Sequence, residues 1–178
     1  MVIYLLANNP SVIKLLEGID ISEADLLVAF NVCIPMGSRK FLNHKNKIII
    51  CRQISPVSVN FFGKKNIKRY SEVFKEIRIV RQTNFTKEQL NYYKKLKKSY
   101  PMITCQTENK CDYLCKNRHS KKTLMAQGGF VGYCMMKQQY PNEEIKLVGF
   151  TRFPDKNEGH SYLHEKQFYS RNKVEFIV

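Results

Sequence analysis

Two histidines and a glutamate near the end of the sequence are the residues best suited to chemistry. In the stretch EGHSYLHEKQFYS, His160 and His164 are four residues apart and share one face if the stretch is helical. Two imidazoles at this spacing are potential metal ligands, although no third ligand is evident. Glu165 follows His160 by five residues, and a histidine with a carboxylate one turn along can act as a general base. The stretch thus predicts a metal site, a catalytic base or two ordinary polar residues.

A turn near the start of the chain has the residues of a nucleotide-binding loop. The apolar run at 2–7 is followed by Asn8 and Asn9, and Pro10 and Ser11 suit the first positions of a helix. A strand, a polar turn and a helix in this order bind phosphates in many α/β sheets, although the glycines of the dinucleotide fingerprint are absent. A plain capping turn explains the same residues equally well.

Paired glycines open the stretch QGGFVGYCMM. Gly128 and Gly129 lie near the start of a predicted helix, where the lack of side chains lets a ligand approach the backbone N–H groups closely. The commoner reason for such a pair is a tight turn or close packing of a helix on a strand. Both interpretations remain open from the sequence.

Three cysteines and a histidine have the chemistry of a zinc site, namely Cys105, Cys111, Cys115 and His119. Their spacing lacks the C-x-x-C knuckle, so scattered thiols are the favoured interpretation. The six cysteines of the chain are expected to be free thiols rather than disulfides, because the N-terminus does not have the pattern of a secretory signal. We therefore predict a cytoplasmic protein without a bound metal.

Composition indicates a globular domain with an anionic partner. The 178 residues are 43% hydrophobic and 25% charged, which suits one domain with a substantial core. The formal net charge of +15 favours nucleic acid, a nucleotide-activated substrate or an acidic membrane surface. No apolar run approaches the roughly 20 residues that cross a bilayer.

The hydrophobic pattern predicts an α/β fold with a mostly parallel sheet. Short apolar runs of the kind found in buried strands occur at 2–7, 25–31, 46–53 and 144–153. Helical patterns occur at 10–20, 86–100 and 119–141. The segment at about 61–101 is strongly basic, and we interpret it as an insert in a single domain that spans 1–178.

Together these stretches resemble the sialyltransferases of glycosyltransferase family 29, and more loosely the bacterial sialyltransferases of family 42. The large sialylmotif of family 29 has a strand, an Asn-containing turn, an ID-type segment, and a strand ending in Asn before a nearby Pro. VIYLLANNPSVIKLLEGIDISEADLLVAFNVCIP is similar in order, with Asn8, Ser11, Asp20, Asn31 and Pro35 at the matching places.

The two shorter sialylmotifs also have counterparts. QGGFVGYCMMKQQYPNEEIKLVGF is similar to the small motif, a Gly-containing helix followed by a strand that ends in YGF, where this chain has VGF. His160 and Glu165 have the H-x-x-x-x-E spacing of the very small motif. The resemblance covers roughly 2–52 and 119–168.

The resemblance implies a Rossmann-like fold of the variant GT-A type and an inverting, metal-independent transfer from a CMP-activated donor. The donor sugar would be sialic acid or a related acid such as Kdo, and no further cofactor is implied. His160 would deprotonate the acceptor hydroxyl with Glu165 as its support. The residues implied to bind the nucleotide are Asn8, Asn9, Ser11, Asn31, Gly128, Gly129 and Gly149.

The first hypothesis is therefore a bacterial enzyme that builds lipopolysaccharide or another glycan at the cytoplasmic face, with no nucleic-acid partner. The basic stretch 64–98 would either contact an anionic membrane or glycolipid acceptor or form a solvated face. The chain is short for the family, so we expect its acceptor-binding elements to be reduced, to be supplied by a homo-oligomer, or to be missing from a decayed protein. The rivals are a nucleic-acid-binding protein that stacks bases on Tyr92, Tyr93 and Tyr100, and an inactive nucleotide-binding relative.

Overall fold

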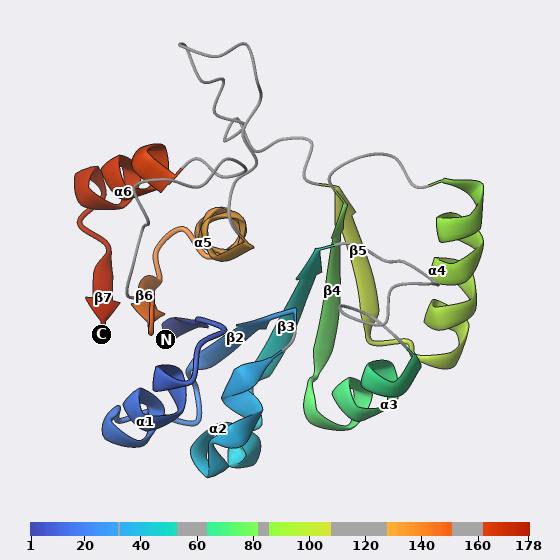
Figure 1. The fold of residues 1–178 in the computed structure, drawn as a ribbon, viewed down its shortest axis with the longest axis horizontal. Coiled ribbons are helices and arrows are strands. Elements are labelled where there is room, and N and C mark those ends of the chain that lie inside the picture. The colour runs from blue at the N-terminus through green and yellow to red at the C-terminus, as the bar shows by residue number, and fades with distance from the viewer. Residues whose placement is uncertain (32, 53–63, 82–85, 108–127, 151–161) are drawn as a thin grey trace.

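A computed structural model describes residues 1–31, 33–52, 64–81, 86–107, 128–150 and 162–178. Seven strands in these ranges form one sheet in the order β5-β4-β3-β2-β1-β6-β7, and every neighbouring pair is parallel (Figure 1). The strands are β1 Val2–Leu6, β2 Leu26–Phe30, β3 Lys47–Arg52, β4 Glu76–Arg81, β5 Ile103–Thr107, β6 Glu144–Val148 and β7 Glu175–Ile177.

Helices cover both faces of the sheet. One face carries α1 Ser11–Gly18, the short 3-10 helix η1 Ile34–Gly37, α2 Arg39–Asn43, α3 Lys64–Val73 and α4 Lys87–Ser99. The other face carries α5 Gly128–Gln139 and α6 Tyr162–Arg171.

Each central strand supplies apolar side chains to both layers. In β3, for example, Ile49 belongs to the first core cluster and Ile48 and Ile50 belong to the second. Burial on both faces is the reason that the strands at the middle of a parallel sheet have continuous apolar runs rather than alternating ones. This is why the runs at 2–7, 25–31 and 46–53 could be recognised in the sequence.

The predicted α/β class is confirmed, and the sheet is wholly parallel among the described strands. The expected strands and helices at 2–7, 10–20, 25–31, 46–53 and 86–100 are present. The strand expected at 144–153 ends at Val148, because Gly149 has a positive φ of 76°. Of the helix expected at 119–141, the structure describes the part from Gly128 onward.

The basic segment at 61–101 is part of the sheet rather than an insert. It contributes α3, α4 and β4, and β4 pairs with β3 on one side and β5 on the other. The sequence of β4, EIRIVR, alternates because Ile77 and Ile79 enter the core while Arg78 points to the opposite face. The charged residues of this segment interrupt its apolar pattern, and for this reason the strand was not predicted from the sequence.

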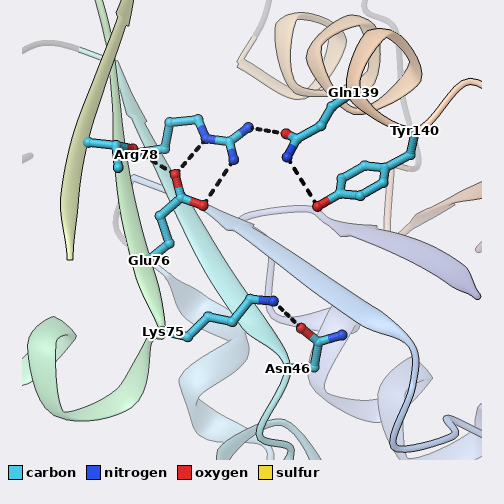
Figure 2. A network of polar contacts seen from close by, with 7 residues as sticks. Asn46, Lys75, Glu76, Arg78, Gln139 and Tyr140 are labelled. Atoms are coloured by element: carbon cyan, nitrogen blue, oxygen red, sulfur yellow. Dashed lines mark hydrogen bonds and ion pairs between the residues drawn. The ribbon is translucent and has the colours of Figure 1, made fainter.

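A polar network joins β4 to the end of α5 (Figure 2). The guanidinium of Arg78 donates to both carboxylate oxygens of Glu76, at 3.0 and 2.9 Å, and to the side-chain oxygen of Gln139 at 2.9 Å. The Thr104 hydroxyl donates to Glu76 at 2.6 Å. Desolvation alone would raise the pKa of Glu76, but the bonds from Arg78 and Thr104 outweigh it and hold that pKa below its usual value.

Asp25 fixes the amino ends of β1 and β2. Its side-chain oxygens accept hydrogen bonds from the backbone N–H of Val2 at 2.8 Å and of Ser22 at 2.9 Å, and the residue is 5% exposed. Burial alone would raise the pKa of this carboxyl, but the hydrogen bonds to Val2 and Ser22 bring it below its ordinary value. The charged form is therefore the one that stabilises the fold.

We predict that Asp25→Asn lowers the free energy of unfolding by about 1–3 kcal/mol at neutral pH, because the amide NH₂ would face a backbone donor. The folded carboxyl has the lower pKa, so its contribution is present above about pH 4 and is lost as the pH falls through the folded pKa. Urea unfolding at pH 7 and pH 3 should show a gap between wild type and variant that narrows in acid. Asp20→Asn, at an exposed position, is the control, and an equal gap at both pH values would contradict the assignment.

Candidate functional site

The order of the strands reverses next to β1. From β1 the chain proceeds through β2, β3, β4 and β5 toward one edge of the sheet, whereas β6 and β7 lie on the other side of β1 (Figure 1). The helices that follow these strands in the chain, α1 after β1 and α6 after β6, lie on opposite faces of the sheet. In open α/β sheets, ligands bind in the crevice outside the carboxyl ends of the strands at such a point.

Asn9 joins the two segments that leave this point. Its side-chain nitrogen donates to the carbonyl oxygen of Gly149, which directly follows β6. Its side-chain oxygen accepts from the backbone N–H of Ser11 at 3.0 Å and from the Ser11 hydroxyl. The backbone N–H of Ala7 also donates to the carbonyl of Val148, at 2.9 Å. Asn9 is thus committed to holding the edge of the sheet together.

Asn8 makes the corresponding link from β1 to β2. Its side-chain nitrogen donates to the carbonyl of Phe30 at 2.6 Å, and its side-chain oxygen accepts from the N–H of Ile34 at a long 3.4 Å. The Asn8 side chain is exposed, whereas Asn9 is partly buried. Asn8 is consequently the asparagine of this turn that can also contact a ligand.

Asn31 continues the row at the end of β2. It has a positive φ of 44°, its N–H donates to the carbonyl of Ile50 at 3.0 Å, and its carbonyl accepts from the Tyr70 hydroxyl at 2.9 Å. Five predicted site residues thus lie at the carboxyl ends of β1, β2 and β6, and we call them the carboxyl-edge row: Asn8, Asn9, Ser11, Asn31 and Gly149.

The glycines at this edge serve backbone geometry and close packing. Gly149 has φ +76°, its N–H donates to the carbonyl of Ile177 at 2.8 Å, and an added Cβ would lie 3.3 Å from the Cβ of Val12. A Cβ added to Gly129 would overlap the ring of Phe150, so α5 approaches the segment after β6 closely because this side chain is missing. The same holds for Gly132 against Phe30, a contact that sequence reasoning missed.

The start of α1 offers a phosphate fewer donors than the turn had suggested. The N–H of Ser11 is bonded to the Asn9 side chain, that of Val12 to the Asn9 carbonyl at 3.2 Å, and that of Ile13 to the Pro10 carbonyl at 3.3 Å. Helix starts bind anions through N–H groups that lack such partners. A ligand at this edge would therefore meet the side chain of Asn8 rather than an open helix end.

Of the two predicted catalytic residues, the structure describes one. His160 lies outside the described residues. Glu165 lies in α6 and is 1% exposed. Its charge acts on Tyr169, whose pKa is raised well above its ordinary value, first by burial and then by Glu165. Tyr169 packs edge-on against Phe130 of α5 at 5.5 Å between ring centroids, which places α6 on the α5 layer.

No metal centre is evident in the described part of the chain. Within those ranges no three His, Cys, Asp or Glu residues are grouped to hold an ion, and Cys111, Cys115 and His119 lie outside them. Cys33 and Cys51 are buried thiols without a disulfide. Burial raises the pKa of Cys33 to about 12 and also raises that of Cys51, so neither forms a thiolate at neutral pH.

None of the helices in the described ranges combines the length and the apolar character needed to cross a membrane. The chain was compared with protein families, with curated proteins and with solved structures, and no match was found in any of the three.

We predict that Gly129→Ala destabilises the protein by about 1–3 kcal/mol, because the new methyl group would force the Phe150 ring or α5 to move. Thermal or urea unfolding measures the effect. Gly18→Ala is the control, since a Cβ at Gly18 meets nothing within 4 Å. Adding Phe150→Leu to Gly129→Ala should recover part of the loss, and purely additive losses would contradict the proposed contact.

We also predict that the two asparagines differ in their effect on stability. Asn9→Ala removes bonds to Gly149 and Ser11 and should lower the free energy of unfolding by about 1–3 kcal/mol. Asn8→Ala removes one good bond from an exposed side chain and should cost less than about 1 kcal/mol. Equal losses in paired denaturation curves would show that Asn8 is as structural as Asn9.

Proposed function

We propose that this chain is a glycosyltransferase that binds a CMP-activated sugar at the carboxyl edge between β1 and β6 and transfers it to a glycan or lipopolysaccharide acceptor. The observation that carries the proposal is the carboxyl-edge row. Its residues come from distant parts of the sequence, yet Asn8 is bonded to the end of β2 and Asn9 to Gly149 after β6. They gather at the point where a sheet of this order binds its ligand.

The residues in this row support recognition of the nucleotide by hydrogen bonds. Asn8 can present its second amide hydrogen and its side-chain oxygen to a base or ribose, because it is exposed and its bond to Ile34 is long. Gly129 lets α5 lie against Phe150, and Gly149 lets the turn after β6 lie against Val12 of α1, so both glycines shape this edge through close packing. Asn9 and Ser11 act indirectly by holding this edge in place.

The proposed reaction is a single displacement at the anomeric carbon. The acceptor hydroxyl gives its proton to the imidazole of His160 while its oxygen forms the new bond to that carbon. The bond between the anomeric carbon and the phosphate oxygen breaks, and CMP leaves with the electron pair. Buried on α6 at 1% exposure, the Glu165 carboxylate would orient and stabilise the imidazolium that forms. The donor would be sialic acid or a related acid such as Kdo.

The proposal includes a cytoplasmic location, peripheral on the inner face of the membrane, where an activated sugar donor and a growing glycolipid would meet. The proposed transfer is metal-independent, as the resemblance to the sialyltransferases implies.

Nucleotide binding provides the first test. Calorimetric titration with CMP, CDP, UDP and AMP should show selective binding of CMP. Asn8→Ala should weaken that binding by up to about 10-fold, the value of one hydrogen bond, without loss of fold. Absence of any nucleotide binding, or equal binding of UDP and AMP, would overturn the proposal.

Turnover provides the second test, with CMP-sialic acid and CMP-Kdo as donors. We expect His160→Ala to lower the rate of transfer or hydrolysis by about 10²–10⁴-fold, the usual contribution of a positioned base. His164→Ala, four residues away in the same stretch, is the matched control and should retain activity. If the two variants behave alike, His160 is not the base. If CMP binds and no sugar is ever released, the inactive-relative hypothesis replaces the enzyme.

A further inference from the structure

Helix α4 presents an outward face that is rich in lysine. Five of its 13 residues are exposed lysines and one is acidic, Glu88. The opposite side of the helix packs on the core through Leu96, which is buried, and through the half-buried Tyr92 and Tyr93. The lysine face consists of Lys87, Lys94, Lys95, Lys97 and Lys98.

Some of the other lysines of this protein have structural partners, whereas exposed lysines such as Lys14 and Lys45 have none among the described residues. Lys40 donates to the carbonyls of Glu17 and Ile19 at the end of α1, and Lys47 donates to those of Leu42 and His44 at the end of α2. Such bonds satisfy carbonyl groups that a helix end leaves open. Lys146 likewise pairs with Glu144 and Glu175. The basic residues that the fold requires are therefore identifiable by their contacts.

The lysine face of α4 has no such role in the described part of the chain, where none of its five side chains makes a hydrogen bond or ion pair. Lys94 and Lys98 are four residues apart on one side of the helix, a like-charge spacing that disfavours the helix. A capping box at Thr86 and Gln89 and the packing of Leu96 compensate. Lys97 and Lys98 lie in the last turn, where cations favour the helix dipole, whereas Lys87 in the first turn and the pair Lys94–Lys98 disfavour the helix. The stability of the helix therefore does not account for all five lysines, whereas an external anion would.

Leu90 lies within this face. It is 39% exposed, and lysines stand three residues before it and four and seven residues after it, at Lys87, Lys94 and Lys97. These spacings place all four side chains on neighbouring positions of one helix surface. The face therefore combines several cations with a single apolar side chain that can enter an apolar layer.

These features favour a lipid surface over a nucleic acid. Single-stranded nucleic acids are held by aromatic side chains on which bases stack, but Tyr92 and Tyr93 of α4 are turned toward the core. The face has lysines and no arginine, and a flexible point charge suits a diffuse negative surface better than paired hydrogen bonds to one group. Leu90 has no partner in a phosphate backbone, whereas the acyl region below lipid headgroups would accept it.

We propose that the lysine face of α4 docks the protein onto an anionic lipid bilayer. The face belongs to the helix layer opposite α5 and α6, beside the β5 end of the sheet, whereas β1 and β6 lie toward the other end (Figure 1). A bilayer on α4 would leave the carboxyl-edge row of β1 and β6 accessible. The inference does not depend on the proposed glycosyltransferase activity, since it requires no nucleotide.

Vesicle co-sedimentation of the full chain tests this directly, with phosphatidylcholine vesicles with and without phosphatidylglycerol. We expect binding to the anionic vesicles alone, falling as salt rises. Replacing Lys94, Lys97 and Lys98 by Gln should weaken partitioning about 100-fold, the combined attraction of three lysines near a charged surface. Leu90→Ser should cause a smaller loss that persists at high salt.

The matched control removes the same charge from the other side of the protein, by replacing Lys137, Lys166 and Arg171 with Gln. It should bind vesicles within a few-fold of wild type, because these side chains lie on α5 and α6. An equal loss of vesicle binding in the two triple variants would overturn the proposal, because binding would then depend on the net charge of the protein rather than on the lysine face. Tighter binding of an RNA or DNA oligonucleotide at the same salt, lost in the α4 variant, would overturn it in favour of nucleic acid. Circular dichroism verifies that each variant is folded.

Discussion

A parallel sheet is stable only when both of its faces are covered, and this requirement determines where the rest of the chain lies. A connection between parallel strands must leave the carboxyl end of one strand and return to the amino end of the next. The helices divide into a layer with α1 to α4 and a layer with α5 and α6. The carboxyl ends of β1 and β6, where the division occurs, are consequently the place at which segments from distant parts of the sequence can meet.

At this edge the segments are joined by the side-chain amides of asparagines. An asparagine has one donor group and one acceptor group, so it can replace the backbone partners that a parallel strand loses where the sheet stops. Asn8 does so for the end of β2 and Asn9 for the residue after β6. Polar residues at strand ends therefore have two possible purposes, to complete the edge or to hold a ligand. Here Asn8 and Asn9 both complete the edge, and they differ in that Asn8 is exposed whereas Asn9 is partly buried.

The sequence predicts the centre of the sheet well because burial on both faces leaves a continuous apolar run, as in LLVAF and KIIIC. It conceals β4, where Arg78 is satisfied by Glu76 and by Gln139, a residue far along the chain. It also conceals β7, whose three residues are exposed or only partly buried. Strands are thus harder to predict toward the edges of the sheet. There, polar side chains that find hydrogen-bond partners far along the chain take the place of a continuous apolar run.

The candidate site follows the same rule. Its location could be predicted, because a polar turn after the first strand and a glycine after the sixth are visible in sequence order. The tie between Asn9 and Gly149 could not, since it joins residues 140 positions apart. The sequence also could not show why position 129 is a glycine, which is that the Phe150 ring occupies the space that a side chain would need. A ligand-binding purpose and a packing purpose select the same small residues, and only the neighbouring side chains separate them.

The central position of β1 also determines the order in which this protein can assemble. Ile3 is aligned with Leu26 of β2 on one side and with Ile145 of β6 on the other. During synthesis the first neighbour emerges soon after β1, whereas the second emerges only once most of the chain has been made. Until then one side of an apolar strand keeps its N–H and C=O groups unpaired, an edge that pairs readily with other chains. The half-made protein, rather than the finished one, is therefore the species that most needs protection in a cell.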